Sequence, residues 1–172
     1  MSALVSKVCV VGDFCVGKTS VVERFVNNQF SDKYLTTIGV KVDTKEVELS
    51  SRGITIKLVI WDVAGADRFG EKEFAYLRGT DGLIYVADGT RPSTFDSLNT
   101  LISQIQTRIG DRPGVLLMNK NDLIGQWKVT QEIKDKFSAL VGATYSTSAK
   151  TGEGVEDALT NLGEQIVAGQ LS

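Results

Sequence analysis

Residues 12–19 constrain the fold of this chain more than any other segment. They read Gly-Asp-Phe-Cys-Val-Gly-Lys-Thr and match the phosphate-binding pattern G-x-x-x-x-G-K-S/T at every fixed position. An apolar, β-branched segment at residues 8–11 precedes them, and Val22, Phe25 and Val26 recur at helical spacing after them. A phosphate-binding loop of this kind lies between a strand and a helix, and this segment has the same order of elements. The segment therefore predicts nucleotide binding.

Each part of this segment has a chemical task. The two glycines let the backbone curl so that successive N–H groups point at phosphate oxygens. The helix that follows directs the positive end of its dipole at the same anion. We expect Lys18 to reach the outer phosphates and the Thr19 hydroxyl to bind Mg²⁺. The other residues expected to line the nucleotide here are Asp13, Phe14, Cys15, Val16, Gly17 and Ser20. The pattern leaves open which nucleotide binds.

The composition is that of a soluble protein, and 172 residues are most simply one domain, residues 1–172. The net charge of −2 gives no reason to expect nucleic acid or an anionic membrane as a partner. The absence of histidine excludes imidazole chemistry. No apolar run approaches the ~20 residues of a membrane span, and neither a secretory signal nor a lipidation motif is found. We therefore expect a cytoplasmic monomer without an intrinsic membrane anchor.

Apolar periodicity predicts strands that alternate with helices. The expected strands are residues 7–11, 40–49, 55–61, 83–87, 114–118 and 144–147. The expected helices are residues 18–28, 93–109, 130–141 and a segment from 155 onward, with a weak helix near 73–77. This order predicts an α/β three-layer sandwich with a six-stranded, mostly parallel sheet. One antiparallel edge strand comes from the hairpin at residues 40–61.

Two finer expectations concern the helices. Ser93, with Asp96 three residues later, is typical of a capping box at a helix start. Ile133, Phe137 and Leu140 recur at helical spacing and predict the buried side of the helix over residues 130–141.

Polar residues and a glycine mark the ends of the predicted strands. Ligands in such sheets bind at the carboxyl ends of the strands. Five candidate residues lie at or just past these ends, namely Gly12, Asp62, Asp88, Asn119 and Ser148. We therefore expect one edge of the sheet to hold the site.

Asp62 ends an apolar strand, where its carboxylate can lie beside the Mg²⁺, directly or through water. Gly65, three residues later, allows its backbone N–H to approach a terminal phosphate. The alternative is that Asp62 caps a following helix, which would be preferred if the phosphate loop were absent. The phosphate loop favours the metal interpretation.

Residues 119–122, Asn-Lys-Asn-Asp, discriminate between bases. Guanine presents two donors along one edge, and the Asp122 carboxylate offers two acceptors in matching geometry. Adenine would place an unprotonated nitrogen against that carboxylate and leave a buried charge unpaired. Asparagine and aspartate also form turns, so the segment is weak evidence alone. Its position after an apolar strand and after the phosphate loop makes guanine the predicted base.

Together with Thr37 and residues 148–150 (Ser148, Ala149 and Lys150), these segments resemble the five nucleotide-binding motifs of Ras-superfamily small GTPases. The similarity covers nearly the whole chain, and residues 36–39, 61–62 and 67–69 are most similar to the Rab branch. The resemblance implies a P-loop NTPase G domain that binds GTP and GDP with Mg²⁺, hydrolyses GTP and acts as a molecular switch.

The resemblance also implies roles for single residues. Phe30 would pack against the guanine, and Tyr34 would cover the phosphates. The Thr37 hydroxyl would bind Mg²⁺ only in the GTP state, and the Gly65 N–H would meet the γ-phosphate. The Ala149 N–H would donate to the guanine carbonyl, while the stems of two lysines flank the base, namely Lys120 and Lys150.

Two loops would be the switches, residues 29–39 and 64–79, ordered by the γ-phosphate and released by hydrolysis. Effector and regulator proteins would bind through these loops. The catalytic residues implied in this way are Lys18, Thr37 and Gly65, and Asp67 is added as a candidate because it is anionic and adjacent to residue 66.

The chain departs from the family pattern at Ala66, where the family has a water-positioning glutamine, and at Phe14, where most members have a small residue. The C-terminus also lacks the family's lipidated cysteine. In these three features the chain resembles prokaryotic Rab-like GTPases. We therefore expect slow hydrolysis, with Asp67 as the alternative group that orients the water. A GTP-holding scaffold with negligible hydrolysis is the second interpretation. An ATP-dependent kinase or ATPase conflicts with residues 119–122.

Overall fold

Apolar strands form the centre of the computed structural model, which describes residues 4–13, 15–31, 39–63 and 69–171. The described part forms a six-stranded sheet in the order β2-β3-β1-β4-β5-β6. β2 pairs antiparallel with β3, and every other neighbouring pair is parallel. The strands are β1 (Leu4–Gly12), β2 (Val40–Leu49), β3 (Ile54–Val63), β4 (Gly82–Asp88), β5 (Gly114–Asn119) and β6 (Thr144–Ser146).

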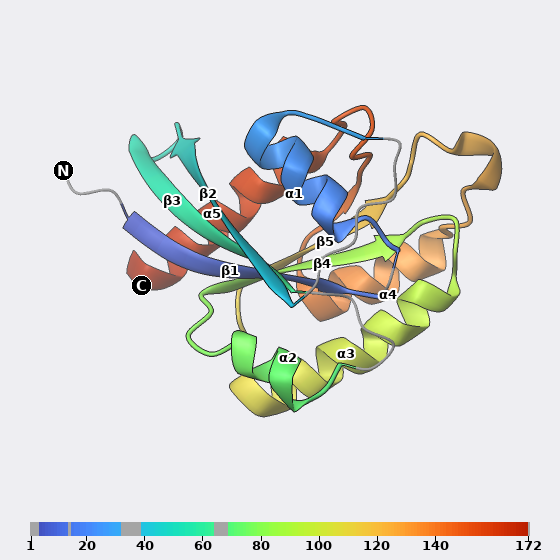
Figure 1. The fold of residues 1–172 in the computed structure, drawn as a ribbon, viewed down its shortest axis with the longest axis horizontal. Helices are drawn as coiled ribbons and strands as arrows, with labels where there is room; N and C mark the ends of the chain where they lie inside the picture. Colours follow the sequence, from blue (N-terminus) through green and yellow to red (C-terminus); the bar gives the residue numbers. More distant parts are fainter. Residues whose placement is uncertain (1–3, 14, 32–38, 64–68, 172) are drawn as a thin grey trace.

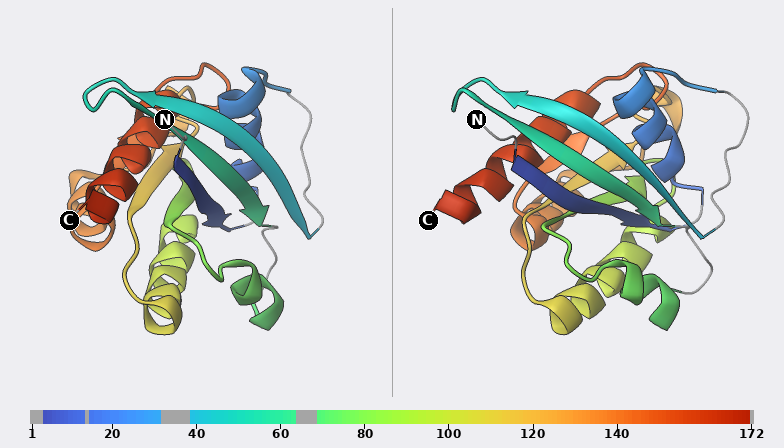
Figure 2. Two further views of the ribbon diagram at one scale, coloured as in Figure 1. Left: turned by 90° about the vertical axis from the view of Figure 1, so that its left-hand side faces the viewer. Right: turned by 60° about the vertical axis from the view of Figure 1, so that its left-hand side comes forward.

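Helices cover both faces of this sheet (Figure 1). They are α1 (Lys18–Asn27), α2 (Glu71–Tyr76), α3 (Ser93–Ile109), α4 (Gln131–Val141) and α5 (Val155–Leu171), with a 3₁₀ turn, η1 (Ile124–Gln126). The buried side chains of α1 and α5 join one core, and those of α2, α3 and α4 join another. Figure 2 shows the two helical layers on opposite sides of the strands. The expected three-layer α/β fold is confirmed.

The strands separate the two cores because successive side chains point to opposite faces. Val8 and Val10 of β1 pack in the α1/α5 core, whereas Cys9 and Val11 pack in the other. Since both faces are covered, β1, β4 and β5 read as nearly continuous apolar runs. This is the physical reason that the sequence predicted these strands so readily.

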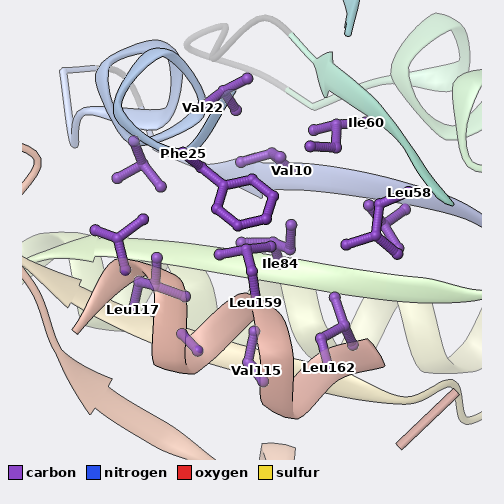
Figure 3. Close-up of a cluster of buried hydrophobic side chains, with 14 of the residues drawn as sticks. Val10, Val22, Phe25, Leu58, Ile60, Ile84, Val115, Leu117, Leu159 and Leu162 are labelled. Carbon is purple, nitrogen blue, oxygen red and sulfur yellow. The ribbon is translucent and has the colours of Figure 1, made fainter. Parts of the chain in front are cut away.

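The core between the sheet and the helices α1 and α5 anchors β1 and α1, the two elements that flank the phosphate loop. Phe25 reaches from α1 toward Ile84 and Leu159, which come from β4 and α5 (Figure 3). Burial of each such side chain contributes roughly 1.5–3 kcal/mol. The apolar residues that recur at helical spacing along α5 are all buried: Val155, Ala158, Leu159, Leu162 and Ile166.

The capping box predicted at Ser93 is wrong. Pro92 occupies the N-cap position of α3 with no side-chain cap, and its φ of −54° already lies in the helical region. The Thr94 hydroxyl stabilises the start of α3 instead. It accepts a hydrogen bond from the Asp88 N–H at 3.0 Å and donates one to the Arg91 carbonyl at 2.7 Å.

The inward position predicted for Leu140 is also wrong. Phe137 is 2% exposed, but Leu140 is 36% exposed at the rim of a shallow groove beside polar residues of α3, Asn99 and Ser103. Most of the other residues that line this groove are polar, so Leu140 stays at the surface. Within the described part of the chain, no helix combines the length and the apolar character needed to cross a bilayer.

Candidate nucleotide-binding site

The phosphate loop leaves the end of β1 at Gly12 and enters α1 at Lys18. Gly17 is the N-cap of α1 with φ 98° and ψ 26°, a left-handed conformation that favours glycine. A Cβ atom at residue 17 would lie 2.4 Å from the Asn119 side-chain nitrogen. That same nitrogen donates to the Val16 carbonyl at 3.0 Å. The second glycine of the motif therefore leaves room for the Asn119 side chain to bind the backbone of the phosphate loop.

Lys18 is 7% exposed, and its ammonium group donates to the Asp13 carbonyl at 3.0 Å. Burial lowers the pKa of Lys18, and the charges of Asp62 and Asp13 offset part of that effect. A buried ammonium at the mouth of a helix N-terminus is stabilised by an anion placed beside it. The arrangement fits a phosphate ligand.

Thr19 and Asp62, the described members of the predicted metal site, lie in contact. The Thr19 hydroxyl donates to Asp62 Oδ2 at 2.7 Å, and the Asp62 side chain is fully buried. Hydroxyl and carboxylate oxygens are ligands that Mg²⁺ prefers. Among the residues that the structure describes, no group of three or more Cys, Asp or Glu residues could hold a metal. A Mg²⁺ ion here would therefore share its coordination with phosphate oxygens, as this ion commonly does.

Asn119 connects three segments from a position at the end of β5, where it is 2% exposed. Besides its bond to Val16, its side-chain oxygen accepts from the Ala149 N–H at 3.2 Å and from the Thr147 hydroxyl at 3.4 Å. Its contacts are thus with the protein, and it organises the site. Because Ala149 donates to Asn119 here, its expected bond to a guanine carbonyl stays a prediction.

Asp122 is held by Ser148. The Ser148 hydroxyl, fully buried, donates to Asp122 Oδ1 at 2.8 Å and accepts from the Thr151 N–H at 3.1 Å. These bonds orient the carboxylate before any ligand arrives. A preoriented acceptor is what recognition of two adjacent donors requires.

Lys120 joins the base-recognition loop to the phosphate loop. Its backbone is left-handed, with φ 73°. Its ammonium group donates to the Cys15 carbonyl at 3.0 Å and pairs with Asp88 Oδ2 at 2.8 Å. The structure thus brings Lys18, Thr19 and Asp62 together with residues 119–122 and 148–149 at one edge of the sheet, as the strand ends predicted.

Sequence reasoning missed three residues that organise this site. Arg24 of α1 donates to the Ala149 carbonyl at 2.8 Å and to the Lys150 carbonyl at 2.5 Å. Thr147 contributes the hydroxyl that contacts Asn119. Asp88 was placed at a strand end but given no role. Only Asp88 carried a signal in the sequence, because it ends an apolar strand at the edge of the sheet where ligands bind.

Several predicted residues lie outside the described part of the chain, namely Phe14, Tyr34, Thr37, Gly65, Ala66 and Asp67. Phe30 is described and is 38% exposed. Its packing against a base stays a prediction, as does the flanking role of Lys150.

Comparisons with known proteins agree with this geometry. The family model described as "Ras family" matches residues 7–168. Ras-related protein Rab-21 of Mus musculus is 32% identical over 163 residues, which cover 94% of this chain and 72% of that protein; Rab-21 of Homo sapiens gives the same values. Ras-related protein RabC of Dictyostelium discoideum is 33% identical over 164 residues, which cover 94% of this chain and 84% of that protein.

Proposed function

The chain belongs to the Ras family of small GTPases, in the Rab branch, and from that premise we propose that it is a Mg²⁺-dependent switch with slow GTP hydrolysis. Membership makes it a GTP-binding protein. The finer proposal concerns which of its own residues bind the nucleotide and the metal, and how fast it hydrolyses GTP.

One observation carries the proposal. Asn119 and Lys120 hydrogen-bond to the carbonyls of Val16 and Cys15, so the loop with Asp122 and the phosphate loop form one unit. A ligand with an anionic end and a base at a fixed separation matches such a unit. A nucleoside di- or triphosphate has this form.

Asp122 supports guanine as the base. Its carboxylate, fixed by Ser148, offers two acceptors to the two donors of guanine. Adenine would cover the same carboxylate without offering it those two donors, and such mismatches discriminate strongly. Phe30 and the stems of Lys120 and Lys150 flank the base in this proposal, and the Ala149 N–H meets its carbonyl.

The residues proposed for Mg²⁺ are Thr19, Thr37 and Asp62. The contact between Thr19 and Asp62 supports the assignment, because it places a hydroxyl oxygen and a carboxylate oxygen 2.7 Å apart at the start of α1. Mg²⁺ bound there would neutralise charge on the β- and γ-phosphates. Lys18 would hold the outer phosphates, Tyr34 would cover them, and the Gly65 N–H would donate to the γ-phosphate.

Slow hydrolysis follows from Ala66. Attack on the γ-phosphate needs a water held in line, and a methyl group can neither donate to that water nor accept from it. Phe14 adds bulk where an activating arginine of a partner would enter. Asp67 is the remaining candidate for orienting the water.

The composition and the net charge support a further proposal, that residues 1–172 act as one G domain, as a monomer in the cytoplasm.

In this proposal, effectors and regulators bind through residues 29–39 and 64–79 and read the nucleotide state. The second candidate is a scaffold that holds GTP and cleaves it negligibly, which Ala66 favours. Single-turnover hydrolysis with GTP and Mg²⁺, and with ATP in parallel, tests both. GTP cleaved slowly and ATP left intact support the switch, and GTP bound but uncleaved over many hours supports the scaffold. Equal cleavage of ATP would contradict the guanine assignment.

A further inference from the structure

The turn between β4 and α3, residues 88–91, contains a buried carboxylate that belongs to neither the predicted phosphate site nor the metal site. Asp88 is 1% exposed. It accepts from the Thr90 N–H at 2.8 Å, from the Thr90 hydroxyl at 2.6 Å and from Arg91 Nε at 3.1 Å. It also pairs with Lys120 at 2.8 Å. A carboxylate is costly to bury without partners, and Lys120 is the partner that comes from another loop.

This carboxylate stays ionised. Burial by itself would raise the pKa of Asp88, but hydrogen bonds from Lys120 and Thr90 outweigh that effect and hold its pKa below the ordinary value. Asp88 therefore presents a permanent negative charge to the Lys120 ammonium group at neutral pH.

Gly89, the next residue, contacts both ends of the base-recognition loop, which we define as residues 119–128. Its N–H donates to the Asn119 carbonyl at 2.9 Å, and its own carbonyl accepts from the Lys128 N–H at 2.8 Å. The Trp127 ring packs so closely that a Cβ atom at residue 89 would lie 2.0 Å from it. Only glycine leaves room for the ring in this position.

Lys120 needs such support. It has a left-handed backbone, which is unfavourable for a residue with a Cβ atom. That conformation turns its side chain toward both Asp88 and the Cys15 carbonyl. The two contacts offset the strain and fix the start of the loop that carries Asp122.

We propose that Asp88 and Gly89 are positioning residues for guanine-nucleotide binding. Asp88 holds the Lys120 ammonium where it can secure the phosphate loop, and Gly89 provides the seat on which Trp127 fixes the loop of Asp122. This inference rests on the proposed function, since it assigns how that site is built.

The central test is Asp88→Asn, which keeps the shape and removes the charge. We expect GDP to dissociate about tenfold faster, because truncating one partner of a buried charge pair acts mainly on dissociation. Lys120→Met should also accelerate release. The double variant should release GDP no faster than Lys120→Met alone, because residues that act as one unit are not additive. A merely structural role for Asp88 would instead make the two effects add.

Two variants test the seat of Trp127. Gly89→Ala should displace the ring, and Trp127→Leu should remove it without introducing a clash. Both should reduce the preference for GDP over ADP by about tenfold, because they loosen the loop of Asp122. In a Trp61→Phe background, Trp127 emission should shift to longer wavelength in Gly89→Ala, which reports the seat independently of nucleotide exchange.

Glu164→Gln is the matched control. Glu164, in the middle of α5, pairs with Arg52 at 2.8 Å and accepts from Ser51 at 2.6 Å, and both partners lie in the turn between β2 and β3. Its loss removes a paired carboxylate without touching the site, so GDP release should change less than about twofold.

GDP release from Asp88→Asn at the unmodified rate, or additive effects in the double variant, would overturn the role of Asp88. Unchanged base preference in Trp127→Leu would overturn the role of the seat. In both cases the unmodified protein still binds GDP in preference to ADP, so the proposed function stands. An unmodified protein that does not distinguish GDP from ADP would overturn the proposed function and this inference together.

Discussion

The Thr19 hydroxyl donates a hydrogen bond of 2.7 Å to Asp62 Oδ2, although 43 residues separate the two in the chain. The bond joins the first turn of α1 to the end of β3. It forms because β1 and β3 are parallel neighbours, with Val10 beside Asp62, so the loop that leaves β1 returns Thr19 over the end of β3. Two oxygens suited to Mg²⁺ therefore meet at the mouth of the phosphate loop.

Removal of the Thr19 hydroxyl should weaken Mg²⁺ binding. We expect Thr19→Ala to need at least about tenfold more Mg²⁺ to slow GDP release, the effect of losing one metal ligand or its close support. Thr19→Ser should restore the behaviour of the unmodified protein. The measurement is the GDP release rate across a Mg²⁺ titration, with a chelator as the zero point. Identical titrations for Thr19→Ala and the unmodified protein would contradict the site.

Loss of the Asp122 carboxylate should remove base selectivity. Asp122→Ala should weaken GDP binding by about 2–3 kcal/mol and leave ADP binding nearly unchanged, because only guanine uses the two acceptors. Equilibrium titration with both nucleotides measures the change. Asp96→Ala, at an exposed acidic position in the first turn of α3, is the control and should alter neither affinity. An unchanged GDP/ADP ratio in Asp122→Ala would assign recognition to other residues.

Lys18→Met should separate stability from binding. Because burial lowers the pKa of Lys18 in the folded protein, its charge is penalised at all pH values below that pKa. The penalty is relieved only as the pH rises through the folded pKa toward the unfolded one. At pH 7 the nucleotide-free variant should therefore be more stable by about 1 kcal/mol, while nucleotide affinity collapses.

Denaturant unfolding of nucleotide-free protein measures that gain. Lys136→Met, an exposed lysine of α4, is the control and should leave the free energy of unfolding nearly unchanged. Destabilisation by Lys18→Met would show that the ammonium contributes to the fold through its bond to Asp13.

Restoring a glutamine at residue 66 should accelerate hydrolysis. We expect single-turnover GTP cleavage to rise by about one to two orders of magnitude in Ala66→Gln, the effect of regaining one group that positions the water. Asp67→Ala should leave the rate unchanged. If Asp67→Ala abolishes cleavage while nucleotide binding persists, then Asp67 orients the water in this chain.

Local chemistry explains what could be predicted from the sequence. The continuous apolar run at residues 8–11 predicted a buried strand, and its side chains do alternate between two cores. The glycines and Lys18 predicted the loop that follows. Strand ends then located Asp62 and Asn119 at one edge, because parallel strands share their carboxyl ends.

What could not be predicted depends on which loops become neighbours. Nothing local to Arg24 indicates that it will hold the carbonyls of residues 149 and 150, more than a hundred positions away. The pairing of Asp88 with Lys120 likewise requires β4 beside β5. The prediction that Leu140 is buried was wrong for a different reason. Helical spacing indicates which side of a helix is apolar, but not whether another element covers all of that side.

Identification of the nucleotide that the purified protein carries tests the central claim most directly. The protein would be denatured, and the released small molecules would be separated and identified by mass spectrometry. We expect GDP or GTP in an amount comparable to the protein, because Asp122, Lys120 and the phosphate loop form one preorganised site. An adenine nucleotide in that amount, or nucleotide-free protein that does not take up added GDP, would contradict the account.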